Sequence, residues 1–498
     1  MDSLSDVNES FSALGAIDDL HSFLVDQQGH TEEEAREIIE RIISPNGLSL
    51  EHFQNYLFDV ELNPPIRPSE VRDDMHAPLS HYYVFTGHNS YLTGNQLTSN
   101  SGVDPIIKAL QRGVRVIELD IWANSSDDDI DVYHGSTITS HVKLKDCLEA
   151  IKEHAFSVSP YPVVLNLENH LTPDLQAKTA QMIEETFGES LFYPNCNSMD
   201  EFPSPQSLMN RIIVSAEHRE EGTEEESGKY NQVITIKDGK PKDGLLKEAL
   251  IDKNPDICDE GVGQLNISES LLEEASELYA PDMVRFSQKN IIRVYPKGLR
   301  IGSSNYDPFP GWVNGAQMVA FNMQGDSKFL WLMHGFFLAN GGSGYVKKPD
   351  YLVSDPLYHL QENIIRPIKM TLKVKIYLGD GWKDDFKKNH FDSFSPPDFY
   401  IEVGIAGAPS DEIIFNTKHV RNSWNPIWDE EFSFPLIVPE LAILSFIVLD
   451  SGVGRDDFGG QICFPVLELK PGIRAVQLSD RQGNKYKSVK ILTKFEFS

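Results

Sequence analysis

Short apolar, strand-like runs alternate with helical patterns over residues 79–217, and this alternation constrains the fold more than any other feature. The strand-like runs are 114–119, 163–167 and 212–214, and helical patterns cover 142–155 and 175–187. Repeated βα units predict a parallel sheet, of which a closed TIM-like barrel is one version. We therefore expect an α/β domain with its chemistry at the carboxyl ends of the strands.

The segments before and after this α/β pattern have different periodicities. Apolar residues recur at near-helical spacing over 17–60, which predicts an EF-hand-like helical module at 1–78. Its loop, Ser44-Pro45-Asn46-Gly47, lacks the ligand run of a calcium loop, so we expect a structural module. Residues 366–498 carry strand-like runs separated by turns, which predicts an all-β sandwich.

The α/β pattern is interrupted at residues 218–262. This segment opens with the acidic, apolar-poor run 220–228, and we expect a flexible linker within one sheet domain. Periodic structure resumes over 263–365, which we assign to the rest of that domain.

The formal net charge of −31 argues against broad electrostatic binding to nucleic acid or to an anionic bilayer. Two explanations of the acidic excess stay open: a solvated surface, or carboxylates that bind a cation such as Ca²⁺. The four cysteines form no CxxC pair, which fits a reducing compartment. Residues 1–6 do not resemble a signal peptide, and no apolar run reaches the roughly 18 residues of a membrane span. We expect a cytoplasmic protein with peripheral membrane contact.

Several oxygen-bearing side chains stand at or near the ends of predicted strands. Glu118 and Asp120 are two residues apart on one strand, so both point to one face. On an interior face this arrangement is costly unless a cation neutralises it. Asn89 and Glu168 would complete an all-oxygen shell that suits Ca²⁺. The alternative is that these carboxylates form ion pairs with residues such as Arg115.

Two histidines lie in neighbouring segments, Gly87-His88-Asn89-Ser90-Tyr91 and Tyr133-His134-Gly135. Near a metal they would transfer protons or stabilise charge, which fits metal-assisted phosphoryl transfer. A lone histidine is more often structural, and the spacing alone leaves that alternative open.

These segments, in this order, resemble the X half of eukaryotic phosphoinositide-specific phospholipase C. Further motifs resemble its Y half: Arg293-Val294-Tyr295-Pro296-Lys297-Gly298, Ser303-Ser304-Asn305-Tyr306 and the segments 315–324 and 340–346. The compact layout, with no pleckstrin-like domain before a short EF-hand-like module, is similar to that of the plant enzymes. The resemblance implies a multidomain protein: an N-terminal α-helical EF-hand-like module, a TIM-like barrel split into X (79–217) and Y (263–365) halves, and a C-terminal C2 domain.

The resemblance also implies roles for individual residues. His88 would stabilise the pentacoordinate phosphate, and His134 would act as general acid toward the diacylglycerol oxygen. Glu118 or its neighbour would help to deprotonate the inositol 2-hydroxyl. Ca²⁺ would be the cofactor, with four ligands: Asn89, Glu118, Asp120 and Glu168.

The head-group pocket departs from the family pattern. Arg293 remains for a ring phosphate and Tyr295 remains to pack on the inositol ring. The other two implied head-group positions are Ser215 and Asn266, the latter where the family has serine. Glu217 stands where the family commonly has lysine, so we predict weakened binding of polyphosphorylated head groups. The alternative is that Glu217 turns to solvent.

In the predicted sandwich, Asp392 and Asp398 flank one loop, and Asp450 and Asp456 lie in a later one. These acidic loops resemble C2 calcium-binding loops, which implies Ca²⁺ presented to lipid phosphate. Merely solvated acidic turns are the alternative.

An apolar rim is also implied by the resemblance. Leu97 and Leu299 match family positions that dip into the bilayer, whereas Ser136 places a polar residue at a third position. Isolated surface leucines are the alternative explanation.

We therefore predict a monomeric, calcium-dependent enzyme at the inner face of the cell membrane. It would hydrolyse phosphatidylinositol phosphates to diacylglycerol and inositol phosphates in signalling. The alternative is a catalytically weakened relative that acts mainly as a calcium-dependent membrane-binding protein. His88 and His134 favour the enzyme, and Glu217 and Asn266 favour the weakened relative.

Overall fold

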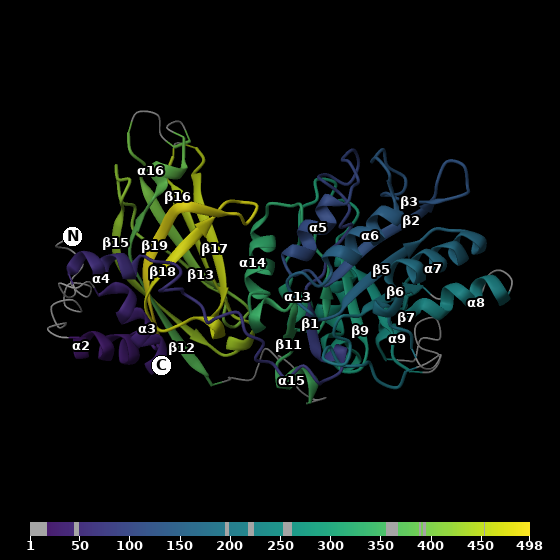
Figure 1. The fold of residues 1–498 in the computed structure, drawn as a ribbon, viewed down its shortest axis with the longest axis horizontal. Coiled ribbons are helices and arrows are strands. Elements are labelled where there is room, and N and C mark those ends of the chain that lie inside the picture. Colours follow the sequence, from purple (N-terminus) through teal and green to yellow (C-terminus); the bar gives the residue numbers. More distant parts are fainter. Residues whose placement is uncertain are drawn as a thin grey trace. The chain divides into compact units, whose positions relative to one another are not determined.

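The computed structural model describes residues 17–43, 49–194, 199–217, 224–251, 261–354, 367–387, 390–391, 395–452 and 454–498. The chain forms two compact units (Figure 1). The barrel unit comprises Ser69–Met333 and Phe337–Ile364, and the sandwich unit comprises Met1–Pro68, His334–Phe336 and Ile365–Ser498. None of the described helices is long and apolar enough to cross a bilayer.

A nine-stranded sheet of order β10-β9-β8-β7-β6-β5-β2-β3-β4 forms the barrel unit. Its strands are β2 (Val116–Ala123), β3 (Ile130–Val132), β4 (Val142–Lys143), β5 (Val163–Asn169), β6 (Ile212–Glu217), β7 (Ile234–Gly239), β8 (Gln264–Ser268), β9 (Ile291–Tyr295) and β10 (Met318–Val319). Neighbours from β2 through β10 pair in parallel, and β3 and β4 pair antiparallel. Separately, β1 (Tyr82–Val84) pairs with β11 (Tyr345–Lys347).

The segment after β1 closes the barrel. Thr86 bridges to Val116 on β2, and Gly87 bridges to Phe321 just beyond β10, both in parallel. The predicted TIM-like α/β barrel is confirmed.

Helices follow most strands, as the sequence periodicity predicted. They are α5 (Asp104–Gln111), α6 (Leu144–His154), α7 (Pro173–Phe187), α8 (Glu224–Val233), α9 (Leu246–Ile251), α11 (Glu269–Leu278), α12 (Ala280–Ser287), α13 (Phe309–Trp312), α15 (Asp350–Val353) and, crossing the unit boundary, α14 (Lys328–Phe336). Short 3₁₀ turns are η2 (Leu79–His81), η3 (Gly188–Ser190) and η4 (Asn340–Gly342).

The barrel interior changes from apolar to polar along the strands. One level is a buried apolar cluster that includes Val116, Val164, Ile213, Ile236 and Ile291. Two residues further along each of these strands, the side chains on the same face are polar. That second level consists of Glu118, Asn166, Ser215, Asp238 and Arg293, all buried. The apolar level therefore forms the floor beneath a polar chamber at the carboxyl ends of the strands.

Residues 224–251 correct the expected flexible linker. They form α8, β7 and α9, and β7 is hydrogen-bonded between β6 and β8 within the barrel sheet. The run Val233-Ile234-Thr235-Ile236 is buried, and burial of these β-branched side chains stabilises a strand there. The sequence prediction missed this short apolar run because the residues around it are mostly acidic or polar. Residues 218–223 and 252–260 lie outside the described residues.

The sandwich unit contains an eight-stranded antiparallel sheet of order β14-β13-β16-β17-β18-β19-β12-β15, which confirms the all-β prediction. Its strands are β12 (Met370–Asp380), β13 (Phe399–Ala406), β14 (Ile413–Asn416), β15 (Ile427–Leu436), β16 (Ile443–Asp450), β17 (Asp457–Pro465), β18 (Gly472–Ser479) and β19 (Lys485–Phe497). Short helical segments are α16 (Trp382–Asp385), η5 (Pro439–Leu441) and η6 (Val466–Glu468).

The N-terminal helices pack against this sheet, within the same unit. They are α2 (Ile17–Ser22), η1 (Phe23–Gln27), α3 (Glu32–Ile42) and α4 (Leu50–Leu57). Apolar residues of the helices share a buried cluster with Tyr377, Ile473 and Leu492 of the sheet. Gln28 fixes the contact, because its side chain donates to the Ile473 carbonyl at 2.7 Å and accepts from the Ile473 amide at 2.6 Å. The loop 44–47 lies outside the described residues.

Candidate active site

Three carboxylates meet at the carboxyl end of the barrel strands. Glu118 and Asp120 lie on β2, and Glu168 lies on the adjacent strand β5, where it is the register partner of Asp120. Oxygen atoms of all three lie within 4.8 Å of one another. The i, i+2 spacing and the parallel pairing together produce this cluster.

The cluster carries more negative charge than its protein partners neutralise. Tyr91 donates to Oδ2 of Asp120 at 2.9 Å, whereas the buried Oδ1 has no partner among the described residues. Burial, Glu168 and Glu118 raise the pKa of Asp120 well above its usual range. Arg293 forms an ion pair with Glu118. An orphaned carboxylate oxygen among all-oxygen donors fits a hard divalent cation such as Ca²⁺.

Asn89 stands beside this cluster. Its backbone amide donates to Glu118 at 3.2 Å, and its Nδ2 donates to Oε1 of Gln96 at 3.1 Å. Because the amide nitrogen is held by Gln96, the carbonyl oxygen Oδ1 is the atom left to ligate a cation. Asn89 has a φ of 43°, a left-handed conformation that asparagine tolerates better than most residues.

Both predicted histidines are half-buried, and each is held by its Nδ1 atom. His134 Nδ1 lies 2.7 Å from the carbonyl oxygen of Gln96, and His88 Nδ1 lies 3.0 Å from Oδ1 of Asn322. These acceptors favour protonation of Nδ1 and leave Nε2 of each ring for substrate. Burial lowers the pKa of His88, an effect that Glu118 opposes.

Glu168 is oriented by a stacked pair of rings. His170 Nε2 lies 3.3 Å from Oε1 of Glu168, and the His170 ring stacks on Trp122 with centroids 3.7 Å apart. This contact with His170 is the main cause that lowers the pKa of Glu168, and Lys240 contributes to the same shift.

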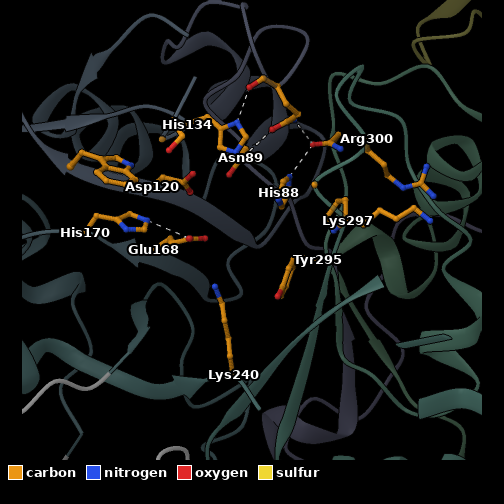
Figure 2. A pocket seen from close by; sticks show the side chains of 17 residues that line it. His88, Asn89, Asp120, His134, Glu168, His170, Lys240, Tyr295, Lys297 and Arg300 are labelled. Atoms are coloured by element: carbon orange, nitrogen blue, oxygen red, sulfur yellow. Dashed lines mark hydrogen bonds and ion pairs between the residues drawn. The ribbon is translucent and has the colours of Figure 1, made fainter. Parts of the chain in front are cut away.

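These residues surround one cavity of about 360 Å³ (Figure 2). One side carries Asp120, Glu168 and His170, and the other carries Tyr295, Lys297 and Arg300, with His88 between them and Lys240 below. The cavity is therefore acidic on one wall and cationic on the other. An anionic ligand bridged by a cation suits both walls.

The four predicted head-group residues do not all line this cavity. Tyr295 does, whereas Ser215 and Arg293 are buried in the polar level of the barrel, and Asn266 is buried as the register partner of Arg293. Ser215 donates to Oε1 of Gln264 at 3.3 Å, and Gln264 donates in turn to Asn266 at 2.9 Å. Their assignment to substrate stays a prediction.

Glu217 ends β6 as an exposed residue, and its register partner across the sheet is Asp238 at the end of β7. Asp238 is buried, and this burial is the first cause that raises its pKa to about 7, with Glu217 adding to the shift. Two acidic residues thus stand at these two neighbouring strand ends.

An apolar rim stands beside the cavity residues. Leu97 is 39% exposed and Leu299 is 83% exposed. The structure adds Ile138, 81% exposed, whose amide donates to the Leu97 carbonyl, and Ile301, whose carbonyl accepts from the amide of Gln96. Ser136 lines the cavity. Sequence reasoning missed the two isoleucines, because nothing in their own segments marks exposure.

Two acidic loops of the sandwich meet where Asp398 contacts Asp450. The Asp398 amide donates to Asp450 Oδ1 at 2.6 Å, and Asp456 accepts from the Tyr400 hydroxyl at 2.7 Å. Asp392 lies outside the described residues. These aspartates already accept hydrogen bonds from the protein, so their roles as calcium ligands stay predictions.

Sequence reasoning also missed three polar residues that organise the site. Gln96 and Asn322 hold the histidines, and Gln96 Nε2 donates to Asn322 at 2.9 Å. Their segments carried no sign of this contact, because they lie 226 residues apart in the chain. Lys240 was missed because it lies within the expected linker.

Family models match three parts of the chain: the X domain of phosphatidylinositol-specific phospholipase C at residues 75–218, its Y domain at 261–351 and a C2 domain at 370–481. Phosphoinositide phospholipase C 6 of Arabidopsis thaliana is 46% identical, with 99% of this chain and 90% of the relative covered. The chain belongs to the phosphoinositide phospholipase C family.

Other members of this family of phosphoric diester hydrolases support the same assignment. Phosphoinositide phospholipase C 2 of Arabidopsis thaliana is 48% identical over 98% of this chain and 94% of its own length. The crystal structure of S. officinalis PLC21 superimposes with a TM-score of 0.80 at 25% identity, covering 99% of this chain and 68% of that one. The phospholipase C fold of this chain is thus shared from the helical module to the C2 domain.

Proposed function

We propose that this chain is a calcium-dependent phospholipase C that cleaves phosphatidylinositol phosphates into diacylglycerol and inositol phosphates in signalling. The observation that carries the proposal is the cluster of Glu118, Asp120 and Glu168 beside His88 and His134 in a chain of this family. The acidic and cationic walls of the cavity suit a phosphodiester head group joined to the protein through a cation.

Asn89, Glu118, Asp120 and Glu168 would hold Ca²⁺. When bound, the ion would make the inositol 2-hydroxyl more acidic and neutralise charge on the phosphate. The orphaned Oδ1 of Asp120 supports this assignment, because an uncompensated buried carboxylate is costly.

The protein residues would move the protons. Glu118 accepts the proton of the 2-hydroxyl as its oxygen attacks phosphorus in line. His134, protonated, donates a proton to the diacylglycerol oxygen as the phosphorus–oxygen bond breaks, which leaves a cyclic phosphodiester. Water then attacks the cyclic phosphodiester. Neutral His134 takes a proton from this water, and protonated Glu118 returns its proton to the departing 2-oxygen as the ring opens. His88 donates from Nε2 to a non-bridging phosphate oxygen as the imidazolium, because its Nδ1 already donates to Asn322, and so stabilises the pentacoordinate state. Glu118 favours this protonated form, since it raises the pKa of His88 against the effect of burial.

Membrane contact would be peripheral, at the inner face of the cell membrane, and the enzyme would act as a monomer. Leu97, Ile138, Leu299 and Ile301 would enter the lipid beside the cavity. The C2 aspartates would hold Ca²⁺ against lipid phosphate.

His134→Ala tests the catalytic assignment. Release of water-soluble inositol phosphate from vesicles should fall at least about 100-fold, because the leaving oxygen loses its proton donor. Calcium-dependent vesicle binding should persist, since His134 lies in the barrel. Release at the wild-type rate would refute the role of His134. Wild-type protein that binds vesicles but releases nothing would favour the membrane-binding alternative.

A further inference from the structure

Lys240 reaches the cavity from a part of the chain that neither barrel family model covers. The matches end at residue 218 and resume at 261, and β7 lies between them. Lys240 directly follows β7 at its carboxyl end. In barrels of this type the loops after the strands line the active site. The segment joining the X and Y halves therefore contributes Lys240 to the lining of the cavity.

Lys240 differs from the other cations that line the cavity. Lys297 and Arg300 both form ion pairs with Glu269. In the part of the chain that the structure describes, no carboxylate lies within ion-pair distance of Lys240. It is also exposed, and its charge acts on Glu168, whose pKa it helps to lower. An exposed ammonium group that lines the cavity and forms no ion pair with a described carboxylate is placed to bind a phosphate group.

The position of Lys240 relates it to the inositol ring. Its Nζ lies 5.6 Å from the centroid of the Tyr295 ring, the residue expected to pack on inositol. Figure 2 shows its side chain directed from below toward Glu168, beside Tyr295. A ring held between the carboxylate cluster and Tyr295 would present its substituents to Lys240.

The local charges explain why a cation is needed there. Glu217 and Asp238 are register partners at the ends of β6 and β7, and both are acidic. Lys240 lies two residues beyond Asp238, immediately after β7 ends. Lys240 thus places a positive charge at the end of β7, near these two acidic residues.

We propose that Lys240 is a substrate-binding residue that contacts a ring phosphate of the inositol head group. The inference rests on the proposed function and refines it, because it names the residue that favours phosphorylated over unphosphorylated lipid. The ammonium group would donate charge-assisted hydrogen bonds to phosphate oxygens.

The test compares Lys240→Gln and Lys240→Arg with Lys247→Gln, which removes an exposed lysine of α9 in the same segment. Hydrolysis by the full chain is measured on vesicles containing phosphatidylinositol with zero or two ring phosphates, at fixed Ca²⁺. For Lys240→Gln the ratio of kcat/KM, bisphosphate over unphosphorylated, should fall about tenfold, mainly through KM. Lys240→Arg should retain most of the ratio, and Lys247→Gln all of it. A ratio unchanged in Lys240→Gln would overturn the inference.

A binding measurement separates this inference from catalysis. The soluble head group inositol 1,4,5-trisphosphate is titrated calorimetrically into the same proteins. Lys240→Gln should bind it about tenfold more weakly than wild type, even if wild type proves inactive on every lipid. Equal affinity, or no binding by wild type, would overturn the role of Lys240, whereas inactivity with intact binding would refute only the proposed function.

Discussion

Replacing Asp120 by asparagine should stabilise the protein without calcium and remove most of the stabilisation that calcium provides. The substitution keeps an acceptor for the Tyr91 hydroxyl and removes one of three charges whose oxygens lie within 4.8 Å. At that distance, and at an effective dielectric near 20, each charge pair repels by about 3.5 kcal/mol. The ion pair between Arg293 and Glu118 and the partial exposure of Glu168 reduce the effect, so we expect about 1–3 kcal/mol of stabilisation without calcium.

Calcium should remove most or all of this advantage of the variant. A ligand at 100 times its Kd stabilises the protein by about 2.7 kcal/mol, and Asp120→Asn should lose most of that gain in the barrel unit. The assay is thermal unfolding in chelator and in excess Ca²⁺, with Asp243→Asn, an exposed aspartate, as the control. The C2 domain shifts both proteins alike, so the difference between them reports the barrel. A variant that is less stable than wild type in chelator, or that gains as much from Ca²⁺, would refute the reasoning.

Three further predictions concern other parts of the chain. Glu217→Lys should raise kcat/KM on the bisphosphate lipid by about three- to tenfold, and an unchanged rate would remove the idea that Glu217 weakens head-group binding. Asp450→Asn combined with Asp456→Asn should weaken calcium-dependent sedimentation with vesicles while leaving hydrolysis of soluble short-chain lipid intact; undiminished sedimentation would contradict the C2 assignment. Burial, with Lys470 and Arg474 nearby, lowers the pKa of His30 from 6.5 to about 4, so the unfolded chain takes up the proton first on acidification. Stability present above pH 6.5 should be lost as pH falls toward 4, by about 3 kcal/mol in denaturant titrations, and His30→Gln should lack this loss.

The carboxylate cluster was predictable because its causes are local. The spacing of Glu118 and Asp120 fixes their common face, and strand-end placement brings Glu168 beside them when β2 and β5 pair in parallel. The contacts of Gln96 with His134 and Asn322 were not predictable, since they depend on how distant loops meet after the barrel closes. The resemblance placed Leu97 and Leu299 on the rim, but the exposure of Ile138 follows from a loop contact that spacing does not reveal.

The strand β7 shows why composition misled the sequence analysis. Its buried isoleucines are only a short run among charged residues, and a strand is not stable in isolation but only when it pairs within a sheet. Neither β6 nor β8 signals in its own sequence that a strand from this segment lies between them. The same error hid Lys240, whose position depends on β7.

The central claim is that the carboxylate cluster holds the Ca²⁺ that hydrolysis requires. The most direct measurement is hydrolysis of a soluble short-chain phosphatidylinositol bisphosphate, below its micelle concentration, as a function of free Ca²⁺, because membrane docking then plays no part. The account predicts no release in chelator, a saturable rise with Ca²⁺, and no rise for Asp120→Asn. Equal release in chelator and in Ca²⁺ by wild-type protein would contradict it.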